Sequence, residues 1–149
     1  FASLLNGFKT IISSEITVIH DAARPFINEN LISESINIAK KYGTAVPVIK
    51  HVDSVYLYKG DNTLSKQIDR SKLLSSQTPQ AYKTKILYDA IQYAEKNNIK
   101  FNFNDVPELI LENGSNPYVF KGSKYNIKLT SNEDILLLKS IHQILNTND

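Results

Sequence analysis

Two charged residues lie close together at the end of a strand-like segment, in the stretch HDAAR at residues 20–24. A carboxylate such as Asp21 can bind a divalent metal or accept a hydrogen bond from a substrate hydroxyl. Ala22 and Ala23 are small enough to let a ligand approach the backbone, and the Arg24 guanidinium could bind a phosphate or orient the aspartate. The same residues could instead form a turn with a local ion pair, and both interpretations stay open at this point.

Arginine is rare in this chain, where only Arg24 and Arg70 accompany the many lysines among 17 basic residues. A guanidinium presents a planar pair of donors to a carboxylate or phosphate, which a lysine ammonium cannot reproduce. The two arginines therefore indicate either anion-binding positions or structural ion pairs, and composition alone does not decide between them.

Other kinds of chemistry have less support. The three histidines, at positions 20, 51 and 142, lack the spacing of a metal site and are interpreted as packing or surface residues. No Gly-x-Ser-x-Gly elbow is present, and the five glycines form neither usual phosphate-binding loop. A net charge of +2 with scattered lysines does not favour nucleic acid as a partner.

The sequence gives no sign of a membrane span or of disulfide chemistry. No apolar run approaches the roughly 18 residues of a membrane span. The absence of cysteine excludes disulfides and fits a reducing compartment. We therefore expect no membrane partner and a cytoplasmic location, or a plastid-like organelle if a targeting segment lies upstream. The chain opens on Phe1 rather than methionine, which is typical of a processed or truncated piece.

The hydrophobic pattern predicts strands that alternate with helices of 10–15 residues. Apolar, β-branched runs predict strands over 15–20 and 44–49, and between them a helix begins at Asn28 or Asn30 and ends at Gly43. Further expected elements are helices at 83–97 and 105–113, strands at 117–120 and 125–130, and a last helix capped by Thr130 or Ser131. This order is typical of a single α/β domain over 1–149 with a mostly parallel sheet.

Residues 54–68 have the pattern of a β-hairpin, with a strand-like run, a Lys-Gly-Asp-Asn turn and a polar return strand. Such a hairpin would bury little apolar surface against its own domain. We therefore interpret residues 52–70 as a projecting β-arm.

Four motifs occur in a fixed order: HDAARPF (20–26), DRSKL (69–73), QTPQAY (77–82) and NIKLT (126–130). Together they resemble the cytidylyltransferases that join CTP to a polyol phosphate, most closely the 2-C-methyl-D-erythritol 4-phosphate cytidylyltransferase family. The ribitol-5-phosphate cytidylyltransferases share the same frame and are the alternative. The resemblance implies a Rossmann-like nucleotidyltransferase fold, a mostly parallel sheet flanked by helices, of which this chain would be the C-terminal two-thirds.

The resemblance also implies the reaction. A phosphate oxygen of the acceptor attacks the α-phosphorus of CTP in line, with Mg²⁺ assistance, and pyrophosphate leaves. Because no covalent enzyme intermediate is needed, the protein's task is positioning and charge neutralisation. The product would be a precursor for isoprenoid synthesis.

The motifs carry the family's site residues onto this sequence. By resemblance, Asp21, Arg70 and Lys128 are catalytic, and Asp21 also lies near the metal. The residues that the resemblance assigns to the acceptor substrate are Ala22, Arg24, Ser54, Thr78 and Asp105. Those that it assigns to the nucleotide are Ser3, Asp21 and Lys128. Val106 stands where the family commonly has an acid, which weakens the contact expected beside Asp105.

In this family the arm crosses to a partner subunit, so the resemblance implies a homodimer. Arg70, Ser54 and Thr78 would then complete the neighbouring subunit's site. The family's first third, with its Gly-rich, basic CTP-binding loop, has no counterpart in this sequence. A second hypothesis is therefore a catalytically incomplete fragment that keeps the acceptor site and the dimer arm.

Overall fold

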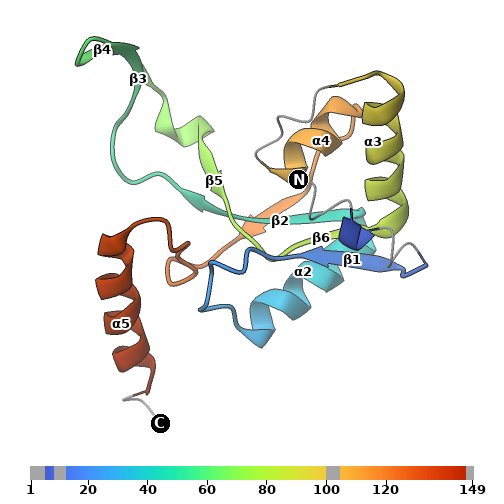
Figure 1. Cartoon of the computed structure of the whole chain (residues 1–149), viewed down its shortest axis with the longest axis horizontal. Coiled ribbons are helices and arrows are strands. Elements are labelled where there is room, and N and C mark those ends of the chain that lie inside the picture. The colour runs from blue at the N-terminus through green and yellow to red at the C-terminus, as the bar shows by residue number, and fades with distance from the viewer. Residues whose placement is uncertain (1–5, 9–12, 100–104, 147–149) are drawn as a thin grey trace.

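The computed structural model describes residues 6–8, 13–99 and 105–146, and it has helices on both faces of a five-stranded sheet (Figure 1). The α/β class and the projecting hairpin are confirmed. The elements in chain order are β1 (Ile16–Ile19), α2 (Glu29–Tyr42), β2 (Thr44–Lys50), β3 (Val55–Gly60), β4 (Thr63–Ile68), the 3-10 turn η1 (Arg70–Lys72), β5 (Leu74–Ser76), β6 (Gln80–Lys83), α3 (Thr84–Lys96), α4 (Val106–Glu112), β7 (Val119–Lys121) and α5 (Asn132–Asn146).

The sheet is mixed, so the prediction of a mostly parallel sheet is wrong for the described residues. Strand β6 lies between β1 and β2 and is antiparallel to both, and β5 is antiparallel to β2. Among the described strand pairs, only β2 and β7 are parallel. The reason is the arm: the chain leaves the sheet after β2 and returns along the same path as β5 and β6. A return of this kind pairs strands antiparallel without a crossover helix.

Alternate residues of the central strands supply two separate cores. Val46 and Tyr82 point to one face and pack with buried residues of α3 and α4. Their neighbours Ala45 and Ala81 point to the other face and pack against Ala39 of α2. The period of two along a strand produces this division, and the small alanines let α2 lie close to the sheet.

Helix α2 begins and ends where the sequence predicts. The side chain of Asn28, rather than Asn30, caps it by accepting a hydrogen bond from the Leu31 backbone at 2.8 Å. Gly43 ends the helix with φ of 90°, and its N–H donates to the Ala39 carbonyl. A left-handed residue at this position favours glycine, which has no Cβ to clash with the backbone.

Strands β3 and β4 form the arm, which projects away from the sheet at the upper left of Figure 1. Asp61 and Asn62 occupy the tip with positive φ, as two-residue hairpin turns require. The arm's apolar side chains are exposed, with Tyr58 at 70% and Leu64 at 63%. The arm therefore leaves apolar surface uncovered, which is the expectation from its sequence.

Residues 126–130 form no strand, contrary to the prediction for 125–130. Single contacts fix this segment instead of a ladder: the Leu129 N–H donates to the Ala23 carbonyl at 2.8 Å, Asn126 is fully buried, and Asp134 of α5 accepts hydrogen bonds from the Thr130 and Ser131 backbones at 2.8 Å. The hydrogen bonds from Thr130 lower the pKa of Asp134 to about 2. Within the described part of the chain, no helix has the length and apolarity to cross a membrane.

Replacing Asn28 with alanine should lower the free energy of unfolding by about 0.5–2 kcal/mol, because the helix loses its side-chain cap. Asn30→Ala is the matched control, since Asn30 lies within the first turn of α2 and its side chain does not cap the helix. Urea unfolding followed by circular dichroism measures both. Equal losses in the two variants would contradict the assignment of the cap.

Candidate active site

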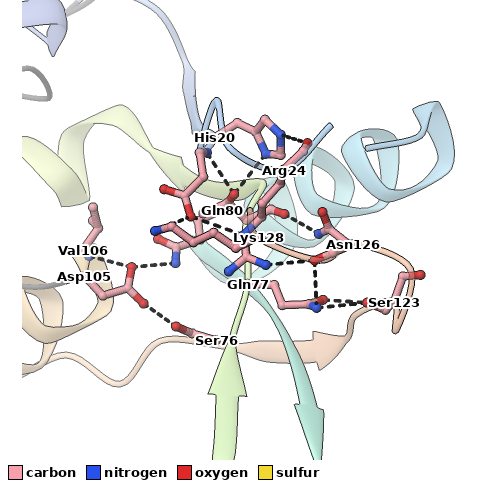
Figure 2. Close-up of polar contacts among 12 residues, drawn as sticks. His20, Arg24, Ser76, Gln77, Gln80, Asp105, Val106, Ser123, Asn126 and Lys128 are labelled. Atoms are coloured by element: carbon pink, nitrogen blue, oxygen red, sulfur yellow. Dashed lines mark hydrogen bonds and ion pairs between the residues drawn. The ribbon is translucent and has the colours of Figure 1, made fainter. Parts of the chain in front are cut away.

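Four separate stretches of the chain meet at one cleft of about 270 Å³, beyond the end of β1 (Figure 2). The loop after β1, the junction between β5 and β6, the start of α4 and the 126–130 segment each supply side chains. The lining residues are Asp21, Arg24, Ser76, Gln77, Thr78, Gln80, Asp105 and Lys128. Five of the predicted site residues therefore lie together.

The Asp21 carboxylate is the centre of the charged side of this cleft. Its Oδ2 lies 3.2 Å from Arg24 Nε and 3.1 Å from Lys128 Nζ. Burial alone would raise the pKa of Asp21, but the hydrogen bonds and charges of Lys128 and Arg24 outweigh burial and lower it. Asp21 is therefore ionised at neutral pH, with two cations beside one oxygen.

Side-chain hydrogen bonds hold the loop that carries Asp21. The Asp21 N–H donates to the Thr78 hydroxyl at 3.0 Å, which lies 3.0 Å from His20 Nδ1. His20 Nε2 lies 3.1 Å from the Arg24 carbonyl. Because a carbonyl can only accept, Nε2 carries a proton, and in the neutral imidazole Nδ1 then accepts from the Thr78 hydroxyl. His20, predicted to be a packing or surface residue, therefore braces the loop.

Asp105 forms the opposite, acidic side of the cleft. Its carboxylate accepts hydrogen bonds from Gln80 Nε2 at 2.8 Å and from the Ser76 hydroxyl, and it caps α4 through the Val106 N–H. The hydroxyl of the buried Tyr82 donates to Gln80 Oε1 at 2.8 Å. Burial raises the pKa of Tyr82, and the charge of Asp105 raises it further, so Tyr82 stays a donor.

No cation pairs with Asp105 among the described residues, so the cleft has one cationic side and one acidic side. Sequence reasoning missed Ser76, Gln77 and Gln80. The two glutamines had one signal, their place in the QTPQAY motif, and Ser76 had none. Neutral side chains without periodicity do not reveal which backbone group or carboxylate they will bind.

Arg70 and Ser54 lie elsewhere, at a second hollow of about 450 Å³ at the base of the arm. Arg70 is exposed and donates from Nη1 to the Val52 carbonyl. Neither residue lines the Asp21 cleft of its own chain. Thr78, which we grouped with them as a contribution to the neighbour, instead lines the Asp21 cleft, because it follows β5 after the chain has returned to the sheet.

Ala22 and Ser3 are the remaining predicted site residues. Ala22 is exposed beside Asp21, as the close approach of a ligand requires. Ser3 lies outside the described residues.

The residues present fit a magnesium ion only if the carboxylate of Asp21 holds it together with groups of the substrate. Within the described ranges, no group of three or more His, Cys, Asp or Glu residues could hold a metal. The second oxygen of Asp21, Oδ1, accepts no hydrogen bond from these residues, whereas both oxygens of Asp105 do. Magnesium commonly takes one or two carboxylates and completes its shell with substrate phosphates and water. Asp21 suits this arrangement.

Lys128→Met should raise the pKa of Asp21, because burial still disfavours the ionised form while one of its two cations is gone. The lowered pKa of the parent contributes stability above the unfolded value, and this contribution is lost as the pH falls through the folded value. The Lys128→Met variant should therefore lose less stability than the parent when the pH is lowered. Carboxyl ¹³C titration by NMR measures the pKa, with Lys124→Met as the control, since Lys124 is exposed and forms no ion pair within the described ranges. An unchanged pKa in Lys128→Met would contradict the pairing.

The family model described as IspD, 2-C-methyl-D-erythritol 4-phosphate cytidylyltransferase, matches residues 1–143. The enzyme of that name from Clostridium tetani is 35% identical over 134 residues, which cover 90% of this chain and 54% of the relative. A ribitol-5-phosphate cytidylyltransferase from Lacticaseibacillus paracasei is 34% identical over 130 residues, covering 87% of this chain and 56% of the relative.

Solved structures agree with the sequence relatives. The 2-C-methyl-D-erythritol 4-phosphate cytidylyltransferase of Thermus thermophilus superposes with a TM-score of 0.86 at 25% identity, covering 95% of this chain and 68% of that one. The 4-diphosphocytidyl-2C-methyl-D-erythritol synthase of Anaerococcus prevotii has a TM-score of 0.79 at 28% identity, covering 95% and 65%. The chain spans between 54% and 62% of the first three curated relatives. Because the family model matches nearly all of its residues, this chain belongs to the 2-C-methyl-D-erythritol 4-phosphate cytidylyltransferase family.

Proposed function

We propose that this protein transfers CMP from CTP to 2-C-methyl-D-erythritol 4-phosphate and releases pyrophosphate. The observation that carries the proposal is the convergence of Arg24 and Lys128 on one oxygen of Asp21 inside the cleft. A fixed carboxylate with two cations can hold phosphate groups in place and neutralise their charge, which is what phosphoryl transfer asks of a protein.

In this reaction a phosphate oxygen of the acceptor forms a new bond to the α-phosphorus of CTP, and the bond to pyrophosphate breaks. Negative charge accumulates on the oxygens around that phosphorus. Lys128 is the more exposed cation of the pair: its side chain is 46% exposed, whereas the Arg24 side chain is 11% exposed and also donates to the Asn126 backbone carbonyl. Lys128 can therefore turn from Asp21 to a phosphate while Arg24 keeps the loop in place.

The acidic side of the cleft suits the polyol part of the acceptor. Hydroxyl groups both donate and accept hydrogen bonds, and Asp105, Ser76 and Gln80 offer a carboxylate, a hydroxyl and an amide in one place. A phosphate would avoid this side because of the charge of Asp105. The two sides would thus fix the direction in which the acceptor lies.

Magnesium would be held by Asp21 together with phosphate oxygens of CTP. When bound, the ion would add positive charge at the triphosphate, in addition to the charge of Lys128 and Arg24. The absence of cysteine fits the reducing cytoplasm as the location.

Ribitol 5-phosphate is the second candidate acceptor, since a ribitol-5-phosphate cytidylyltransferase is 34% identical to this chain. Both acceptors are polyol phosphates, and both would use the same two sides of the cleft. We favour methylerythritol phosphate because the family model and the first three curated relatives carry that name.

We further propose a homodimer that forms through the 52–70 arm. The arm exposes Tyr56, Leu57, Tyr58 and Leu64 at its surface, and Arg70 with Ser54 lines a hollow at its base that is separate from the Asp21 cleft. A second copy that received this arm would cover the apolar side chains and bring Arg70 to its own cleft. The phosphate-binding set would then come from two subunits.

The enzymatic proposal predicts that the full-length protein releases pyrophosphate from CTP only when a polyol phosphate is present. Lys128→Met should lower kcat/KM by about 10- to 100-fold, since a hydrogen bond to a charged group contributes about 1.5–3 kcal/mol. A coupled pyrophosphate assay with each acceptor measures this. Lys85→Met is the control, because Lys85 pairs with Asp89 on the exposed face of α3. Turnover with ribitol 5-phosphate alone would move the protein to the second candidate, and no turnover with either would refute the transfer.

The shared site predicts that two impaired variants restore activity when they form mixed dimers. Lys128→Met and Arg70→Ala should each be impaired, but a mixed dimer would hold one intact site, with Lys128 from one subunit and Arg70 from the other. Random re-association of equal amounts should recover about a quarter of the parent activity. Each variant dissociated and re-associated by itself is the control. No recovery in proven mixed dimers would place Arg70 outside the neighbour's site.

A further inference from the structure

The segment that carries Lys128 forms no strand, and two kinds of contact hold it: those of Asn126, and a backbone hydrogen bond from the Leu129 N–H to the Ala23 carbonyl at 2.8 Å. The Asn126 side chain is fully buried, and its Nδ2 donates to the Thr78 carbonyl at 2.6 Å. The backbone carbonyl of Asn126 accepts hydrogen bonds from Arg24 Nη1 at 2.8 Å and from Gln77 Nε2 at 3.3 Å. One residue therefore binds the Arg24 loop and the junction between β5 and β6, two positions before Lys128 (Figure 2).

Gln77 holds the turn that leads into Asn126. Its Nε2 donates to the Ser123 carbonyl at 2.9 Å, and its Oε1 accepts from the Ser123 N–H at 3.1 Å. Gly122 makes room for this contact, since a Cβ there would lie 2.3 Å from Gln77 Oε1 and 3.3 Å from the Val48 backbone nitrogen. The turn is thus fixed on the sheet side before the chain reaches the cleft.

One polar atom of Asn126 finds no hydrogen-bond partner in the part of the chain that the structure describes. Its Oδ1 is buried and accepts no hydrogen bond from the described residues. An unsatisfied buried acceptor destabilises a fold, and such atoms are uncommon enough in native proteins to need an explanation. An asparagine that served stability alone would be expected to pair this atom. The other contacts of Asn126, and the residues that they position, therefore need a separate explanation.

We propose that Asn126 is a positioning residue for the transfer reaction, setting the place of Lys128 and of the Arg24 guanidinium relative to Asp21. It acts through these two cations and does not line the cleft itself. The chemical meaning of this role rests on the proposed cytidylyl transfer, whereas the geometric role stands on the contacts alone. Thr78 is the shared point, because its hydroxyl binds the Asp21 backbone and its carbonyl binds Asn126.

The geometric role is tested by crystal structures of the parent and of Asn126→Ala. In the variant, Lys128 Nζ should lie beyond the 3.1 Å of the parent ion pair with Asp21 Oδ2, outside the roughly 4 Å limit of an ion pair. Should Asn126→Ala fail to fold, Asn126→Ser keeps a donor but is too short to bridge to Thr78, and it takes the place of the alanine variant. An ion pair retained at the parent distance would overturn the proposal.

The catalytic consequence is tested by a double-mutant cycle in the full-length protein. Asn126→Ala should lower kcat by about 10- to 100-fold with little change in KM, as expected when reacting groups are displaced. In a Lys128→Met background the same change should cost less than about threefold, because the part of its effect that passes through Lys128 is already lost, while Arg24 keeps its hydrogen bond to the backbone carbonyl of residue 126. Losses that multiply independently would indicate a merely structural role and would overturn the proposal.

Ser35→Ala is the matched control. The buried Ser35 hydroxyl donates to the carbonyl of Pro79, the neighbour of Thr78, but it comes from α2 and does not line the cleft. Its loss should lower thermal stability and leave kcat unchanged, and an equal fall in kcat would also overturn the proposal. If the parent protein shows no cytidylyl transfer, the proposed function fails, and the crystal structures alone decide the role of Asn126.

Discussion

A single carboxylate oxygen, Asp21 Oδ2, organises the cleft, because two cations from distant parts of the chain converge on it. Partial burial opposes ionisation of this carboxylate, and Lys128 and Arg24 overcome that opposition. Removing either cation would leave a partly buried charge less well compensated, so the loop after β1 and the 126–130 segment depend on each other. The charges that would receive phosphate groups are thereby also the charges that join two segments of the fold.

The sheet brings these segments close together but does not determine their conformations. The Asp21 loop, the junction between β5 and β6 and the Lys128 segment are all irregular, and single backbone hydrogen bonds together with side chains satisfy their backbone groups. Thr78, Gln77 and Asn126 supply side chains for these contacts. Irregular backbone near a ligand site can adopt shapes that strands and helices cannot, and buried side-chain hydrogen bonds give it a single conformation.

The two sides of the cleft and the hollow under the arm differ in charge, and therefore in the groups that they can bind. Arg24 and Lys128 suit anions, whereas Asp105, supported by Gln80 and through it by Tyr82, suits hydroxyl groups. Arg70 is kept away from both by the arm within one chain. In the proposed homodimer, an arm that buries little of its own surface would be the physical link between the fold of one chain and a site formed by two.

Local features could be predicted from the sequence. Capping by an asparagine at the start of α2, the glycine that ends it and the hairpin turn depend on residues within a few positions of each other. The order of four short motifs indicated the family. The direction of β6, the absence of a strand at 126–130 and the braces supplied by His20, Gln80 and Asn126 were decided only by the tertiary structure. Contacts such as Arg24 to Asn126 join residues 102 positions apart, and neutral side chains that bind backbone carbonyls leave no periodic pattern from which such a contact could be read.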